Sequence, residues 1–168
     1  SVDEAEVNYE LAFAINANAP KFMAEELLKS GGRILQISTD FVFNGEQNYP
    51  YQSNQKQSAI NIYGSSKSLG ERYIEAILKK QKQYIILRTS WLMGGIGNNF
   101  ASSILNLHSK KDTLQVISDQ IGCPTNPYTL AEICFRSISK WHDIYSPNYF
   151  EKPILHWCED GLASWYDV

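Results

Sequence analysis

Short β-branched runs that alternate with longer amphipathic segments are the feature that most limits the possible folds of this chain. Residues 33–39 and 84–90 are typical of buried strands, and between them apolar residues recur at helical spacing over about 62–80. Strands separated by helices of this length favour βαβ units. We therefore predict an α/β fold with a parallel sheet and flanking helices.

The same patterns predict the other elements. The segment 43–59 is polar and is expected to be a loop, and loops of this length are often functional. The remaining expected elements are a helix from Asn8, kinked or restarted at Pro20 and ended by Gly31 and Gly32, a helix capped by Asn98 or Asn99 through Leu107, a strand at 114–117, a helix at about 130–141, a strand at 154–158 and a helix starting at Ser164.

Composition excludes several classes of function. The 168 residues correspond to about one domain, and the net charge is −3 with no basic block beyond 79–82, which argues against a nucleic-acid partner. No apolar run approaches the ~20 residues of a membrane span. The three cysteines are scattered along the chain, which predicts free thiols in a reducing cytoplasm. The three histidines are also scattered and have no metal-ligand spacing, so no metal site is expected. These features favour a soluble cytoplasmic protein.

Polar side chains at the strand ends suggest a particular chemistry. Tyr63 and Lys67 are four residues apart, so on a helix they share one face. A nearby ammonium lowers the pKa of a phenol from its usual value near 10 and makes it useful in proton transfer. The Thr39 hydroxyl, at the preceding strand end, could stabilise charge on a substrate oxygen. This set suits delivery of a proton to a ketone oxygen while hydride arrives at the carbon.

The Tyr-x-x-x-Lys spacing alone also arises on exposed helix faces. Here it lies between other distinctive stretches that run along nearly the whole chain. They are VDEAE at 2–6, AINA at 14–17, ISTDFVFNG at 37–45, IYGSSK at 62–67 with Gly70 and Glu71, LRTSW at 87–91, GNNF at 97–100, DQIGCPT at 119–125 and SWYD at 164–167.

In this order the stretches resemble the extended short-chain dehydrogenase/reductase family, and within it the dTDP-4-dehydrorhamnose reductases. The resemblance implies NADPH-dependent reduction of the 4-keto group of a nucleotide-linked deoxysugar, with NADH as the other possible cofactor. It also implies a small-molecule nucleotide-sugar substrate, and a homodimer is a candidate assembly. In fold, it implies that the chain contains part of a Rossmann-like parallel sheet with flanking helices and part of a smaller substrate-binding region. The resemblance implies Thr39, Tyr63 and Lys67 as catalytic residues, Tyr63, Lys67, Thr89 and Ser90 as cofactor-binding residues, and Val2, Asp3, Asp40, Trp91 and Asn99 as substrate-binding residues, with Trp91 packed on the deoxyhexose.

Three features depart from the family pattern. Phe41 stands where a tyrosine is common, and Ser58 and Ala59 stand where a proline is usual. The GxxGxxG turn that holds the cofactor diphosphate is not found in the sequence. We therefore expect the chain to be the central and C-terminal part of a longer enzyme, with 1–117 in the Rossmann-like domain and 118–168 mainly in the substrate-binding region. The isolated chain is expected to bind NADPH poorly and to be inactive.

Two other functions remain open at this stage. One is a non-catalytic regulatory subunit similar to that of methionine adenosyltransferase, although a retained Thr39, Tyr63 and Lys67 set disfavours it. The other is a nucleotide-sugar epimerase or dehydratase. Dehydratases usually place an acidic residue after the Thr-Asp pair, whereas this chain has Phe41.

Overall fold

The computed structural model describes residues 2–95, 97, 99–146 and 153–168. Two compact units make up the chain. The first comprises Ser1–Arg88 and Ser137–His156, and the second comprises Thr89–Arg136 and Trp157–Val168. The predicted division into a Rossmann-like domain at 1–117 and a mainly substrate-binding region at 118–168 stays a prediction.

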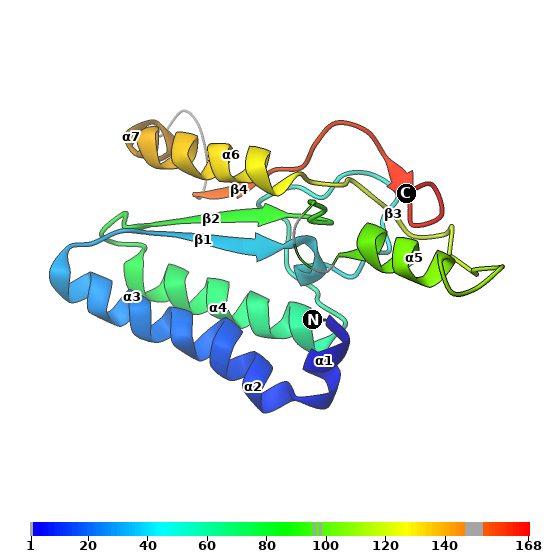
Figure 1. The fold of residues 1–168 in the computed structure, drawn as a ribbon. Helices are drawn as coiled ribbons and strands as arrows, with labels where there is room; N and C mark the ends of the chain where they lie inside the picture. The colour runs from blue at the N-terminus through cyan, green and yellow to red at the C-terminus, as the bar shows by residue number, and fades with distance from the viewer. Residues whose placement is uncertain (1, 96, 98, 147–152) are drawn as a thin grey trace. The chain divides into compact units, whose positions relative to one another are not determined.

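A three-stranded sheet forms the centre of the first unit, in the order β1 (Ile34–Thr39), β2 (Tyr84–Thr89) and β4 (Ile154–His156). β2 and β4 are parallel, with Ile86 opposite Ile154, and β1 and β2 point the same way in Figure 1. Every residue of β2 is buried, as expected for a strand covered on both faces. The predicted α/β class with a parallel sheet is confirmed.

Alternate side chains of β2 contact helices on opposite faces of this sheet. Tyr84 and Ile86 pack in one apolar cluster with residues of α3 (Ala19–Ser30) and α4 (Ile62–Leu78), the two helices that run beneath the strands in Figure 1. Ile85 packs in a second cluster with Trp141 and Ile144, which are the ends of α7 (Trp141–Ile144). Because successive side chains of a strand point to opposite faces of the sheet, β2 packs against helices on both faces.

As predicted, the N-terminal helical region restarts near Pro20. The residues just before this restart form a π-helical segment. α1 (Val2–Val7) and α2 (Tyr9–Phe13) lead into π-helical Ala14–Asn18, which ends where Pro20 occupies the first turn of α3. Proline has no N–H to donate, and a π-segment is one of the ways in which a helix accommodates such a break. Gly31, at φ 76°, ends α3 in the left-handed conformation as expected.

The start of α4 lies unusually close to the turn that follows β1. Asn61 caps the helix, with its Oδ1 accepting from Gly64 N at 2.7 Å. A Cβ on Gly64 would lie 2.0 Å from the carbonyl oxygen of Phe41. Only glycine permits this approach, which fixes the residues around Tyr63 against the end of β1.

The second unit contains less regular structure. Its elements are α5 (Phe100–His108), the first part of α6 (Pro127–Ser139), and the antiparallel pair β3 (Ile121–Gly122) and β5 (Ala163–Ser164). The predicted strand at 114–117 is wrong, because this segment forms no ladder with another described strand. The predicted helix at Ser164 is also wrong, because Ser164 belongs to β5 and its N–H and hydroxyl both donate to Asp167 Oδ2 within a turn.

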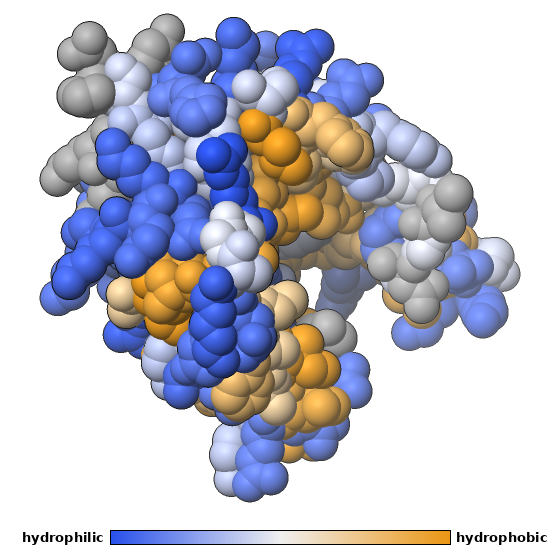
Figure 2. Space-filling view, turned by 90° about the vertical axis from the view of Figure 1, so that its left-hand side faces the viewer, coloured by the Kyte–Doolittle hydropathy of each residue, from blue (hydrophilic) through white to orange (hydrophobic). Residues whose placement is uncertain are grey.

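The surface shows apolar patches between hydrophilic regions (Figure 2). In the first unit, Leu11, Ile15 and Phe22 are each more than half exposed. Exposed apolar side chains that gather on one helical region are typical of contact surfaces. Among the described residues no helix is long and apolar enough to cross a membrane.

Candidate active site

Thr39 ends β1 and starts the short 3-10 turn Asp40–Val42. Its hydroxyl donates to Asp40 Oδ1 at 3.0 Å and accepts from the N–H of Phe41 at 3.2 Å. Thr39 is buried and Asp40 partly buried. Burial raises the pKa of Asp40, while the hydrogen bond from Thr39 opposes this rise. The carboxyl end of β1 therefore presents a hydroxyl and a carboxyl group that are hydrogen-bonded to each other.

Tyr63 lies in the first turn of α4 and interacts with these groups. Its ring meets the ring of Phe41 edge-on, with centroids 5.8 Å apart. Burial raises the pKa of the phenol, a side-chain hydrogen bond with Thr39 lowers it, and the charge of Asp40 raises it further. The net direction is upward, so the phenol keeps its proton throughout the neutral range.

Lys67 lies one turn further along α4, as the spacing predicted. Its Nζ donates to the carbonyl oxygen of Ile37 at 2.8 Å. Burial lowers the pKa of Lys67, and the nearby charge of Glu71 opposes this. The expected lowering of the Tyr63 pKa by Lys67 is not met, because burial and Asp40 shift that pKa upward and Lys67 is held by the main chain of β1.

Val2 and Asp3 lie in α1, which is hydrogen-bonded to the N-terminal end of α4. Glu6, one turn after Asp3, accepts a hydrogen bond from the N–H of Ile62 at 2.7 Å. This N–H is one of the unsatisfied donors of a helix N-terminus. The first unit thus places α1 beside the helix turn that carries Tyr63.

The other predicted site residues lie in the second unit, where their polar groups have local partners. The Thr89 hydroxyl donates to Thr125 Oγ1 at 3.3 Å, and the Ser90 hydroxyl donates to the carbonyl oxygen of Cys123 at 2.7 Å. Trp91 stacks on Trp165. The segment after β2 is therefore fastened to residues 123–125.

Asn99 forms a complete capping box at the start of α5. Its Oδ1 accepts from Ser102 N at 3.1 Å, and its N–H donates to Ser102 Oγ at 3.0 Å. Its side-chain amide also donates to the carbonyl oxygen of Gly94 at 2.7 Å. Of the two residues predicted as caps, Asn99 is confirmed, and Asn98 lies outside the described residues.

A family model described as RmlD substrate binding domain matches residues 1–168. The chain belongs to the RmlD substrate-binding domain family.

Among relatives of the chain is the dTDP-4-dehydrorhamnose reductase of Aggregatibacter actinomycetemcomitans, 35% identical over 167 residues, which are 99% of this chain and 55% of the relative. A crystal structure of a dTDP-4-dehydrorhamnose reductase from Clostridium acetobutylicum is 37% identical, with a TM-score of 0.86 over 99% of this chain and 55% of the other. The enzyme of that name from Bacillus anthracis, in complex with NADP, is 33% identical, with a TM-score of 0.85 and the same coverage. The chain spans about half the length of the relatives it matches.

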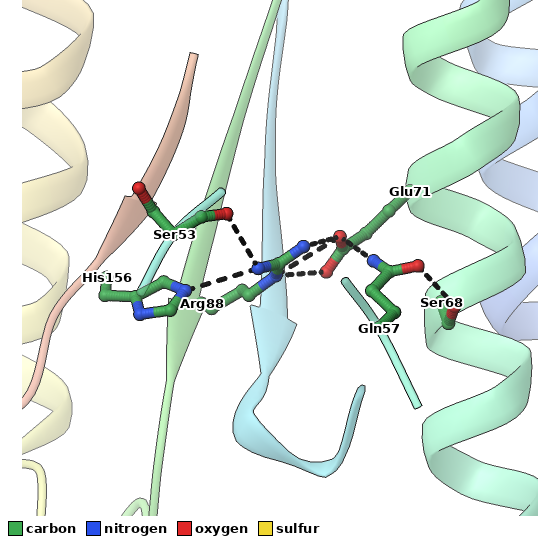
Figure 3. Close-up of polar contacts among 6 residues, drawn as sticks. All are labelled: Ser53, Gln57, Ser68, Glu71, Arg88 and His156. Atoms are coloured by element: carbon green, nitrogen blue, oxygen red, sulfur yellow. Dashed lines mark hydrogen bonds and ion pairs between the residues drawn. The ribbon is translucent and has the colours of Figure 1, made fainter. Parts of the chain in front are cut away.

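A buried polar network, which the sequence did not reveal, holds the long loop in the first unit (Figure 3). Arg88 and Glu71 form an ion pair at 2.7 Å. Gln57, in the loop, donates to Glu71 Oε2 at 2.5 Å and accepts from the Ser68 hydroxyl at 2.5 Å. The Arg88 guanidinium also donates to the carbonyl oxygen of Ser53 at 3.2 Å.

His156 extends the network at the end of β4. Its Nε2 lies 3.3 Å from Arg88 Nη1, and its Nδ1 lies 3.1 Å from the carbonyl oxygen of Tyr51. Burial and the Arg88 charge both lower the pKa of His156, which keeps the imidazole neutral beside the guanidinium. The loop is thus held at Tyr51, Ser53 and Gln57 before it enters α4. Local spacing gave no signal for these contacts, because the partners are far apart in the sequence.

Proposed function

We propose that the full-length protein containing this chain reduces the 4-keto group of a nucleotide-linked 6-deoxyhexose, with dTDP-4-dehydro-L-rhamnose as the expected substrate and dTDP-L-rhamnose as the product. The observation that supports this most directly is the cluster of Thr39, Asp40, Tyr63 and Lys67 at the carboxyl end of β1. Membership of the RmlD family and the names of its relatives agree with that chemistry.

NADPH is the proposed cofactor, and NADH the other possibility. An ammonium has three N–H donors, and Lys67 uses one of them on the carbonyl oxygen of Ile37. The two others suit the vicinal hydroxyls of a nicotinamide ribose. Tyr63, Thr89 and Ser90 are proposed as further cofactor contacts, and the Bacillus anthracis relative was crystallised with NADP. When bound, NADPH supplies the hydride that reaches C4 of the sugar.

Tyr63 is the proposed proton donor. Because its pKa is raised, the phenol is protonated at neutral pH and can transfer its proton to the C4 oxygen as that oxygen gains charge. The Thr39 hydroxyl is proposed to donate a hydrogen bond to the same oxygen and to stabilise this charge. The ketone gains one hydride and one proton, and the phenolate recovers its proton from water.

The substrate-binding assignments also remain proposals. Val2, Asp3 and Asp40 are proposed to contact the sugar. Trp91 and Asn99 are proposed as further substrate contacts. Assembly as a homodimer and a cytoplasmic location are further predictions for the full-length protein.

The proposed reaction is tested by Tyr63→Phe in the full-length protein. We expect kcat for NADPH oxidation with dTDP-4-dehydro-L-rhamnose to fall at least ~100-fold, since general acid catalysis is worth about 100- to 10,000-fold. Binding of dTDP-L-rhamnose should be retained. Tyr73→Phe, on the same helix, is the matched control and should keep wild-type turnover. Wild-type kcat in Tyr63→Phe would overturn the proposal.

A further inference from the structure

Trp91 has a backbone conformation that a bulky side chain rarely adopts. Its φ is 39°, and it is one of two non-glycine residues with positive φ in the described part of the chain. Such a conformation costs free energy and persists only where the surrounding contacts hold it. The residues that contact Trp91 therefore show how this conformation is held in place.

One face of the Trp91 indole is covered by Trp165. The two rings are nearly parallel, at 14°, with centroids 3.6 Å apart. Trp165 is itself fixed, because its indole N–H donates to Gln120 Oε1 at 3.0 Å and Phe100 packs against its ring at 4.4 Å. Such aromatic contacts contribute beyond their buried area.

The other face of the indole is covered by Gly122. A Cβ built on Gly122 would lie 2.5 Å from Cε2 of Trp91, 2.7 Å from Cζ2 and 2.8 Å from Nε1. Cε2 is bonded to both other atoms and is the nearest, so the glycine lies over the ring face and not beside its edge. At these distances Gly122 and Trp165 cannot share one side of the ring, and Trp91 is held between them.

The two covering residues are themselves connected. Gly122 belongs to β3, where it pairs with Ala163 of β5, two residues before Trp165. The main chain of Trp91 is tied to the segment after β3, since its carbonyl oxygen accepts from Thr125 N at 3.0 Å. The indole and main chain of Trp91 are thus held by residues that are also connected to each other. We call this group of residues the Trp91 clamp (Trp91, Gly122 and Trp165).

We propose that Trp165 and Gly122 are positioning residues that hold Trp91 so that it meets the substrate with the edge of its indole. This inference rests on the proposed function and refines the expectation that Trp91 packs on the deoxyhexose, because both ring faces are already covered. The edge carries Nε1–H, which has no hydrogen-bond partner among the described residues. A sugar hydroxyl or carbonyl oxygen is the chemistry that such a donor recognises.

The positioning role is tested in the full-length protein by Trp165→Ala, Trp165→Phe and Gly122→Ala. The alanine methyl at 122 cannot be placed without moving the indole. For Trp165→Ala and Gly122→Ala we expect KM for the nucleotide sugar to rise about three- to tenfold, with the KM for NADPH unchanged. Trp165→Phe keeps an aromatic ring on Trp91 and should restore most of the affinity. An unchanged sugar KM in both alanine variants would overturn the positioning role.

A spectroscopic measurement separates the clamp from the reaction. Two stacked indoles give an exciton couplet in circular dichroism, which Trp165→Phe should abolish and which Trp141→Phe, the matched control in the first unit, should leave. A couplet that survives Trp165→Phe would overturn the clamp itself. A wild-type protein that reduces no nucleotide sugar would overturn the proposed function, and the couplet would still decide whether the clamp exists.

The edge contact is tested by Trp91→Phe, which keeps a flat ring between the covering residues but has no N–H. If the N–H binds the sugar, the nucleotide-sugar KM should rise about three- to tenfold while the KM for NADPH stays constant. A sugar KM equal to that of the wild type would show that the N–H is not used, and would overturn the edge contact.

Discussion

Arg88 and Glu71 form a buried, bidentate ion pair between β2 and α4. Arg88 Nε donates to Glu71 Oε1 at 3.0 Å and Nη2 donates to Oε2 at 2.7 Å, and the two side chains are only 4% and 2% exposed. Glu71 follows Lys67 by one helical turn. The pair therefore fixes the helix that carries Tyr63 and Lys67 against the central strand.

Removal of one partner of this pair should destabilise the protein strongly. Arg88→Met leaves the Glu71 carboxylate buried without its cation, and we expect a loss of about 3–5 kcal/mol in the free energy of unfolding, measured by urea denaturation. Arg88→Met combined with Glu71→Met removes both charges and should recover part of that loss. A double variant less stable than Arg88→Met alone would contradict this account. Lys29→Met, which breaks the exposed pair with Glu26, is the control and should have no measurable effect.

Replacement of Gly64 by alanine should destabilise the protein for a steric reason. An alanine methyl would lie 2.0 Å from the Phe41 carbonyl oxygen, so α4 or the turn after β1 must move. We expect Gly64→Ala to cost about 1–3 kcal/mol in unfolding free energy and to lower turnover, because Tyr63 is the preceding residue. Gly95→Ala is the control, since no atom lies within 4 Å of its added Cβ. Equal stabilities for the two variants would refute the steric explanation.

Local sequence patterns predicted the part of the fold that carries the candidate catalytic residues. The β-branched run that ends in Thr39 and the helical spacing of Tyr63 and Lys67 depend on neighbours in the sequence, and both elements form where expected. The same holds for the stop at Gly31, where the left-handed conformation requires glycine.

The errors fall where distant partners decide the structure. Residues 114–117 have strand-like composition, but a strand also needs a neighbouring strand to bond, and the described residues provide none there. Ser164 is a good helix cap by type, yet its pairing with Ile121 and its bonds to Asp167 form a strand end and a turn. The Arg88–Glu71 pair and the Trp91 clamp were unpredictable for the same reason.

Lys67 should contribute to cofactor binding more than to stability. Lys67→Met removes the ammonium while its methylene chain is largely kept, and we expect the KM for NADPH to rise about tenfold, since a hydrogen bond to a charged group is worth about 1.5–3 kcal/mol. The measurement is steady-state NADPH oxidation at saturating nucleotide sugar. Lys79→Met, at the exposed end of the same helix, should leave the KM unchanged. An NADPH KM equal to that of the wild type in Lys67→Met would contradict the proposed ribose contact.

Asp40 should control the pH range over which Tyr63 donates its proton. The negative charge of Asp40 raises the pKa of Tyr63, so Asp40→Asn should lower that pKa. A proton donor is active in its protonated form, and activity is therefore full below the Tyr63 pKa and falls as pH rises through it. The falling limb of kcat/KM against pH should move to lower pH in Asp40→Asn, whatever happens to the maximal rate. Asp143→Asn, which removes a carboxylate from α7, is the control and should leave the limb in place. A limb that stays fixed or moves to higher pH in Asp40→Asn would show that Asp40 does not set the pKa of the proton donor.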